Sequence, residues 1–275
     1  MKISLFASAI RPHLWPSLLD SLKSNKCEYE VIFAGYIESS LAKEITDKYS
    51  EFKYITTLDI KPAQCYEIAR IACRGEIIAW ISDDCVFPEG ALDKILKYWE
   101  HNPGKKDILA IKTHDPECTN NDLNDQRFFS RNLNTPQMAV IGFISNEYLQ
   151  ELGGLDRRYI YGKFEYDICM RALADGGKII KYEDFCIKIE HTQKNAEYTN
   201  DWSGVNEDSE TLENSWVIGG YKDFEKPIYS ITENNIVPYF PISNREVTLK
   251  RLDEFEPFED KDILEKSQGK NTRWL

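Results

Sequence analysis

Residues 75–88, GEIIAWISDDCVFP, carry a continuous apolar run that leads directly into two adjacent aspartates. The run at residues 77–81 contains only apolar and aromatic side chains, as is typical of a central strand that is covered on both faces of its sheet. Asp83 and Asp84 follow at the point where such a strand ends. Ligands of open α/β sheets bind at the carboxyl ends of the strands, and two carboxylates there can hold a hard divalent cation. A simple acidic turn is the competing interpretation, because Asp is a common turn residue.

Strand and helix patterns alternate on both sides of this stretch. Before it, β-rich runs are separated by segments with apolar residues at helical spacing, and the same alternation resumes after it. This order predicts an α/β fold with a mostly parallel, Rossmann-like central sheet that is flanked by helices. The expected strands are residues 2–10, 29–34, 53–57, 75–81, 108–112, 138–145, 178–182 and 187–190, and the expected helices are residues 14–22, 41–49, 62–74, 89–100, 146–152 and 164–175.

Two polar regions interrupt the alternation. Residues 114–137 are rich in Asn and Asp and show no period, which indicates a long surface loop and a candidate for a lid or an acceptor contact. The segment beyond residue 195 has aromatic residues to pack, but no pattern that specifies a fold. We therefore expect a main α/β domain at residues 1–195 and a C-terminal extension at residues 196–275 with no role assigned by its pattern.

Composition argues against several classes of protein. The net charge of −12 disfavours a general nucleic-acid binder and a protein that binds anionic membranes. The seven cysteines are scattered singly, without a CxxC pair, so we expect reduced thiols and a cytoplasmic protein. No apolar stretch approaches the ~20 residues of a membrane span, and we expect neither a span nor a signal peptide. An oligomer is compatible with these features.

Three polar side chains after the acidic pair are further candidates for chemistry. Glu165 and Asp167 lie in the first turn of an expected helix, where the helix dipole favours a carboxylate. Either could act as a general base if it faced a cleft, but Asp167 precedes Arg171 by four residues and is expected to pair with it. His191 could add an imidazole to a cation site, which would favour Mn²⁺ over Mg²⁺, whereas a surface histidine is the simpler interpretation.

Taken together, the motifs resemble family 2 nucleotide-sugar-dependent glycosyltransferases with the GT-A fold. The resemblance covers residues 1–195 and rests on GEIIAWISDDCVFPEGAL, ELGGLDRRY, FEYDICMRALADGG and IEHT in this order. It implies a nucleotide-sugar-binding half at residues 1–112 and an acceptor half at residues 113–195. The chain departs from the family pattern at Ser82 and Phe164, where acidic residues are usual.

The resemblance also implies roles for individual residues. Asp84 would bind a divalent cation, Mn²⁺ or Mg²⁺, that bridges the nucleotide diphosphate, and His191 would complete that metal site. Glu165 would act as the catalytic base on the acceptor hydroxyl. The nucleotide-sugar-binding residues that it implies are Ser8, Ala9, Arg11, Glu38, Gln64 and Asp83.

The activity expected from these roles is a metal-dependent, inverting transfer of a sugar from a nucleotide-sugar donor to a carbohydrate or other hydroxyl acceptor. The cation would neutralise the departing diphosphate while the base deprotonates the acceptor. Two alternatives stay open. A nucleotidyltransferase-like enzyme would need a glycine-rich phosphate loop after the first strand, and residues 8–15 contain no glycine. A non-catalytic carbohydrate- or nucleotide-binding protein would keep the fold without the chemistry.

Overall fold

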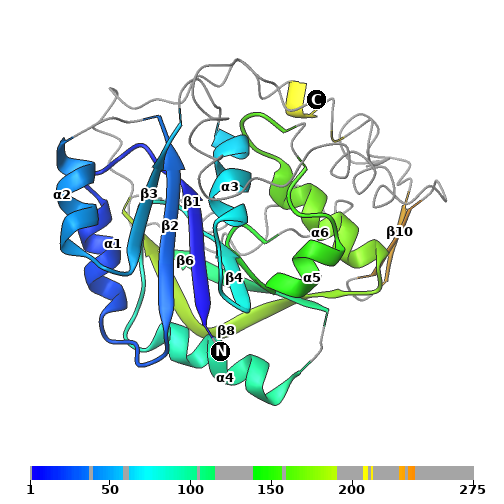
Figure 1. Ribbon diagram of the computed structural model, residues 1–275. Helices are drawn as coiled ribbons and strands as arrows, with labels where there is room; N and C mark the ends of the chain where they lie inside the picture. Colours follow the sequence, from blue (N-terminus) through cyan, green and yellow to red (C-terminus); the bar gives the residue numbers. More distant parts are fainter. Residues whose placement is uncertain are drawn as a thin grey trace.

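The computed structural model arranges the chain around a central sheet with helices on both of its faces (Figure 1). It describes residues 2–36, 40–57, 62–103, 106–114, 139–156, 159–190, 207–209, 212, 229–232 and 235–238. The strands are β1 (Ile3–Ser8), β2 (Tyr29–Gly35), β3 (Phe52–Thr56), β4 (Ile77–Trp80), β5 (Cys85–Val86), β6 (Asp107–His114), β7 (Gly142–Ser145), β8 (Lys178–Ile189), β9 (Tyr229–Thr232) and β10 (Asn235–Pro238). The helices are α1 (Trp15–Leu22), α2 (Ser40–Lys48), α3 (Pro62–Ile71), α4 (Ala91–His101), α5 (Asn146–Glu151) and α6 (Phe164–Ala174).

The described strands form an eight-stranded sheet in the order β3-β2-β1-β4-β7-β6-β8-β5, and β9 and β10 form a separate antiparallel pair. The four strands β3, β2, β1 and β4, which are neighbours in this order, run parallel to one another, and β6 runs parallel to β8. β7 is antiparallel to both of its neighbours, and β5 is antiparallel to β8. Parallel pairs thus outnumber antiparallel ones in the described sheet, and the expected α/β fold is confirmed.

Alternation along the strands divides the core between two layers of helices. On β4, Ile78 and Trp80 pack in the layer that holds α3, α5 and α6, whereas Ile77 and Ala79 pack in the layer that holds α1, α2 and α4. Each of these four side chains is at most 1% exposed. Successive strand residues point to opposite faces, so a strand that is apolar throughout serves both layers. This is why the run at residues 77–81 has no polar alternation.

The order of the strands reverses between β1 and β4. β1 lies between β2 and β4, so the first crossover of the chain leads to one side of β1 and a later crossover leads to its other side. The carboxyl ends of parallel strands at such a reversal border a crevice, where α/β sheets bind their ligands. The residues that follow β1 and β4 therefore meet where a ligand is expected.

The strand expected at residues 138–145 begins at Gly142 in the structure, where the Trp80 ring packs beside it. β7 begins at Gly142, where an added Cβ atom would lie 2.1 Å from the Trp80 ring. The indole Nε1 of Trp80 donates a hydrogen bond of 3.2 Å to the Ala139 carbonyl. Glycine at position 142 thus permits β7 to pair with β4 in the register that sets Trp80 opposite Gly142.

The two strands expected at residues 178–182 and 187–190 form the single strand β8. Its 12 residues pair with β6 on both sides of a register shift between Ile111 and Lys112. After the shift, Lys112 pairs with Cys186, so residues 183–185 bulge from the ladder without ending the strand. The polar residues of this bulge are what interrupts the apolar pattern in the sequence.

Other expectations are tested only in part. The six cysteines within the described residues are free thiols. Among the helices that the structure describes, none has the length and apolar character needed to cross a membrane. Most of the loop expected at residues 114–137 and most of the extension at residues 196–275 lie outside the described residues. The domain boundary at residue 195 stays a prediction.

Candidate active site

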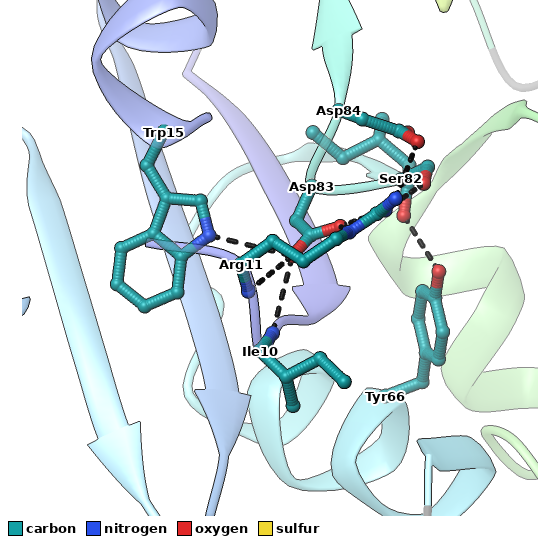
Figure 2. A network of polar contacts seen from close by, with 8 residues as sticks. Ile10, Arg11, Trp15, Tyr66, Ser82, Asp83 and Asp84 are labelled. Carbon is teal, nitrogen blue, oxygen red and sulfur yellow. Dashed lines mark hydrogen bonds and ion pairs between the residues drawn. The ribbon is translucent and has the colours of Figure 1, made fainter. Parts of the chain in front are cut away.

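The acidic pair, Asp83 and Asp84, follows β4 and meets the turn after β1 (Figure 2). The two aspartates are 3% and 2% exposed, and both contact Arg11 from that turn. Arg11 binds Asp83 Oδ1 through Nη2 and through Nε, the latter at 2.9 Å, and its Nη1 lies 2.8 Å from Asp84 Oδ2. One guanidinium therefore bridges two carboxylates in the expected crevice, and these three side chains together carry a charge of about −1 at neutral pH.

Asp83 also fixes the backbone of the turn after β1. Its Oδ2 accepts the backbone N–H groups of Ile10 and Arg11, each at 3.1 Å, and the indole Nε1 of Trp15 at 3.4 Å. Its Oδ1 accepts the Arg11 side chain. Both oxygens of Asp83 are thus engaged in holding this turn (Figure 2).

Ser8 is the last residue of β1, and Ala9 follows it. The Ala9 N–H donates to the Ala34 carbonyl at 2.9 Å, and the Ala9 carbonyl accepts the hydroxyl of Tyr54 at 3.3 Å. A Cβ atom on Gly35 would lie 2.1 Å from the Ala9 carbonyl oxygen, so this close approach of the two segments requires glycine. The position of Ala9 is therefore set by the ends of β2 and β3.

Charge compensation dominates the electrostatics of this cluster. Burial alone would lower the pKa of Arg11, but the charges and hydrogen bonds of Asp83 and Asp84 outweigh burial and raise that pKa above its ordinary value. The Arg11 side chain is 23% exposed, while those of the two aspartates are at most 4% exposed. Arg11 is thus the more accessible member of the cluster, and it remains a cation at all pH values at which proteins fold.

Tyr66, on α3, connects the acidic pair to the start of α6. Its hydroxyl donates a hydrogen bond of 2.8 Å to the Ile81 carbonyl (Figure 2), and its ring packs against Phe164 with centroids 4.6 Å apart. Burial raises the pKa of Tyr66 well above its ordinary value, and nearby negative charges, including Asp83 and Glu165, add to the rise. Tyr66 therefore contacts both the segment that leads to the acidic pair and the residue that precedes Glu165.

Asp167 is committed to the fold. Asp167 and Arg171 are both 0% exposed, and Arg171 Nε and Nη2 lie 2.8 and 2.7 Å from Asp167 Oδ2. Arg171 Nη1 also donates to the Leu152 carbonyl, which ties α6 to the end of α5. The expected Asp–Arg pair on one helix face is confirmed, and the role of Glu165 as the base stays a prediction.

Glu165 has different surroundings. Within the described residues it forms no ion pair, and its buried Oε2 makes no hydrogen bond. Burial raises the pKa of Glu165, Asp208 adds to the rise and Lys163 opposes it. A carboxylate with a raised pKa holds a proton more tightly than an exposed one, which suits a general base that works near neutral pH.

Of the three other predicted site residues, only Gln64 lies within the described part of the chain. Gln64 lies on α3 and is 4% exposed, so it is enclosed by the protein rather than presented on its surface. Glu38 and His191 lie outside the described residues, so the nucleotide contact and the imidazole ligand stay predictions. Within the described part of the chain, no group of three or more His, Cys, Asp or Glu side chains is arranged to hold a metal ion.

Sequence reasoning missed Trp15 and Tyr66 as members of the site. Both lie on helices among apolar neighbours, where an aromatic residue signals packing. Their functions in the site depend on the polar tips of the two side chains, an indole N–H and a phenol hydroxyl, which reach the acidic pair and the end of β4. No spacing in the sequence distinguishes such a residue from an ordinary core aromatic.

The parallel half, the acidic turn at the point of strand reversal and the mixed half beyond it make up the GT-A fold of glycosyltransferases. The chain is similar to S. aureus TarS 1–349 in complex with UDP-GlcNAc, with 13% identity and a TM-score of 0.55 over 72% of this chain and 61% of that chain. It is also similar to a structure of S. aureus TarS, with 15% identity and a TM-score of 0.55 over 69% of this chain and 36% of that one. The mannosyltransferase PcManGT from Pyrobaculum calidifontis, in complex with GDP-Man and Mn²⁺, has 13% identity and a TM-score of 0.50 over 70% of this chain and 57% of that one.

These likenesses establish the fold. The chain spans 36% to 61% of the length of the three structures, and identities of 13–15% carry no residue-level assignment. Neither a protein-family model nor a curated protein sequence matches the chain. The GT-A fold expected from the sequence motifs is thereby confirmed from the structure.

Proposed function

We propose that the protein is a glycosyltransferase that moves a sugar from a nucleotide-diphosphate donor to an acceptor hydroxyl. The configuration at the anomeric carbon of the sugar is inverted in this transfer. The observation that carries this proposal is that Tyr66 contacts the segments that hold both carboxylate centres. Its hydroxyl bonds to the Ile81 carbonyl, two residues before Asp83, and its ring packs against Phe164, which precedes Glu165 at the start of α6. The fold supports it, because similar structures hold UDP-GlcNAc and GDP-Man. The acceptor is a carbohydrate or another hydroxyl compound.

Arg11 is the main cationic group on the donor side. A nucleotide diphosphate adds negative charge to the crevice, and the partly exposed guanidinium offers planar N–H donors that match phosphate oxygens. Asp83 holds the backbone of Ile10 and Arg11, so the turn keeps its shape while the Arg11 side chain moves between carboxylate and phosphate. Ser8 and Ala9 line the same turn.

The chemistry of the acidic pair fits a divalent cation at Asp84 better than at Asp83. Both oxygens of Asp83 already hold the turn, whereas the contact of Arg11 with Asp84 is made at Oδ2. One carboxylate together with phosphate oxygens is a common ligand set for Mg²⁺ or Mn²⁺, with His191 as a further candidate. When bound, the ion would supply Lewis-acid stabilisation of the leaving diphosphate. Arg11 has to release Asp84 for this ligand set to form.

On the acceptor side, Glu165 takes the proton of the attacking hydroxyl. The acceptor oxygen attacks the anomeric carbon from the face opposite the diphosphate, so the new glycosidic bond forms as the bond to the diphosphate breaks, with inversion. Among the described residues Glu165 has no cation bound to it, and burial raises its pKa, which favours proton uptake. Asp167 cannot replace it, because Asp167 is bound to Arg171.

Assays of UDP or GDP release from UDP- and GDP-sugars, with Mn²⁺ and a panel of sugar acceptors, test this proposal. Glu165→Gln is expected to lower turnover about 10²- to 10⁴-fold, the usual contribution of a general base. Asp84→Asn is expected to lower it through loss of the cation and donor site. Asp47→Asn, at a side chain that is 64% exposed on α2, is the matched control.

Undiminished turnover in both site variants would contradict the proposed function. A wild-type protein that binds nucleotides but releases no UDP or GDP with any acceptor would favour the non-catalytic binding protein instead.

A further inference from the structure

A segment of the C-terminal extension contacts the loop that leads to Glu165. Residues 207–209 are helical and are drawn in yellow in Figure 1. Asp208 within this segment is 1% exposed, and its carboxylate accepts three backbone N–H groups of the loop before α6. The donors are Ile160 at 2.8 Å to Oδ1, Tyr161 at 2.7 Å to Oδ2 and Gly162 at 2.9 Å to Oδ2. Hydrogen bonds to an ionised acceptor are among the strong ones in proteins.

The loop that Asp208 holds leads into a strained entry to α6. Lys163, the N-cap residue of this helix, has a φ of 68°, and it is the one non-glycine residue with positive φ in the described part of the chain. A left-handed conformation costs such a residue roughly 1–2 kcal/mol and persists where the surroundings impose it. The residues that precede Lys163 are held by Asp208 and also by α3, where the Ala63 N–H donates to the Ile160 carbonyl at 2.9 Å.

Leu212 provides a second, apolar attachment of the same segment. It is 1% exposed and packs in the core layer that holds α3 and α6. The extension is therefore attached to the main domain through a buried carboxylate and a buried leucine, four residues apart.

We propose that Asp208 is a positioning residue for Glu165, which holds the loop at residues 160–162 so that α6 presents Glu165 to the acceptor. This inference rests on the proposed function of Glu165 as the base. It gives part of the C-terminal extension a role in the reaction, although Asp208 itself accepts backbone N–H groups and does not contact the reacting atoms.

Asp208 also acts on Glu165 through its charge. After burial, which raises the pKa of Glu165, the charged side chains that act on it are Lys163, which lowers the pKa, and Asp208, which raises it. Two further titratable side chains interact electrostatically with Glu165, and both are neutral: Tyr66 of α3 and Cys169 of α6. Removal of the Asp208 charge is therefore expected to lower the pKa of Glu165 and to move the acid limb of the rate profile to lower pH.

Asp208→Asn tests the proposal, with Glu207→Gln as the matched control, because both remove one negative charge and Glu207 is exposed. In Asp208→Asn we expect kcat to fall about 10- to 100-fold, as for a displaced catalytic group, with donor KM close to that of the wild type and the acid limb shifted to lower pH. Glu207→Gln should match the wild type in all three. An unchanged kcat and an unchanged pH profile in folded Asp208→Asn would overturn the proposal.

Amide hydrogen exchange separates failure of this inference from failure of the proposed function. In the wild type, the amides of Ile160, Tyr161 and Gly162 should be protected, and Asp208→Ala should speed their exchange whether or not the protein transfers sugar. Unprotected amides in the wild type would overturn the positioning role. Protected amides in a wild type that transfers no sugar would refute the base role of Glu165, and with it the positioning role.

Discussion

The acidic pair and Glu165, the two predicted carboxylate centres, have opposite surroundings. Asp83 and Asp84 share the guanidinium of Arg11, and Asp83 also accepts two backbone N–H groups and an indole. Glu165 has no ion pair within the described residues, and burial raises its pKa. The same chemical group can thus serve two purposes. The carboxylates that are paired with Arg11 stabilise a turn and could exchange Arg11 for another cation, whereas a buried carboxylate without an ion pair can take up a proton.

Helix α6 repeats the contrast over two residues. Asp167 is fully buried and paired with Arg171. It thereby stabilises the contact between α6 and the end of α5, where Arg171 donates to the Leu152 carbonyl. Glu165 lies in the same helical turn, without an ion pair in the described part of the chain. The pairing of one acid leaves the other as the only candidate base of the helix.

The largest effect on stability is expected from breaking the buried pair of α6. Arg171→Met would leave Asp167 as an uncompensated buried charge and is expected to lower the free energy of unfolding by about 3–5 kcal/mol in urea titrations at pH 7. Lys43→Met breaks an exposed pair with Asp47 at the same spacing of four residues and should change stability little. A loss in Arg171→Met no larger than that in Lys43→Met would show that α6 does not depend on this pair.

A smaller effect is expected from removing the cation that the acidic pair shares. In Arg11→Met, Asp84 no longer has its 2.8 Å ion pair, so the affinity for Mn²⁺ alone is expected to rise about tenfold, equivalent to ~1.4 kcal/mol. Electron paramagnetic resonance of free Mn²⁺ measures this without any substrate. The double variant Arg11→Met, Asp84→Asn should lose the gain. Equal Mn²⁺ affinity in Arg11→Met and the wild type would argue against competition between Arg11 and a metal.

The smallest effect is expected on the pH dependence of stability. Because the pKa of Glu165 in the folded protein is raised above its ordinary value of 4.5, the folded state binds the proton more tightly than the unfolded state. The free energy of unfolding of the wild type should therefore fall as the pH rises from about 4.5 through the raised pKa. Glu165→Gln lacks the titrating group and should not show this fall.

Urea titrations from pH 4 to 8 measure this difference, with Glu89→Gln at an exposed carboxylate as control. We expect the stability of Glu165→Gln relative to the wild type to increase with pH and then level off. A difference that decreases with pH would contradict the raised pKa of Glu165.

Local signals were sufficient for much of the fold and part of the site. The apolar run of residues 77–81 and its acidic end give β4 and the acidic pair, because burial on both faces leaves a direct trace in composition. The Asp167–Arg171 pair follows from a spacing of four residues. Both depend on residues that are close in sequence.

The remaining features depend on contacts between distant segments. Arg11 and Asp83 are 72 residues apart, and Asp208 and Ile160 are 48 residues apart, so no local pattern links either pair. The glycine at position 142 of β7 is needed because Trp80 of β4 packs against it, and the single strand β8 depends on a register shift in its pairing with β6. The sequence does not identify Tyr66, because its hydroxyl bonds to the carbonyl of Ile81, 15 residues away, while its ring has the pattern of a core residue.

The most direct test of the division between the two carboxylate centres is calorimetric titration of UDP and GDP, each with Mn²⁺, into Asp84→Asn and Glu165→Gln in parallel. Glu165→Gln should bind the nucleotide with the affinity of the wild type, because Glu165 acts on the acceptor. Asp84→Asn should lose about tenfold or more in metal-dependent affinity, ~1.4 kcal/mol or more. Weakened binding in Glu165→Gln together with wild-type binding in Asp84→Asn would contradict the assignment of the acidic pair to the donor and of Glu165 to the acceptor.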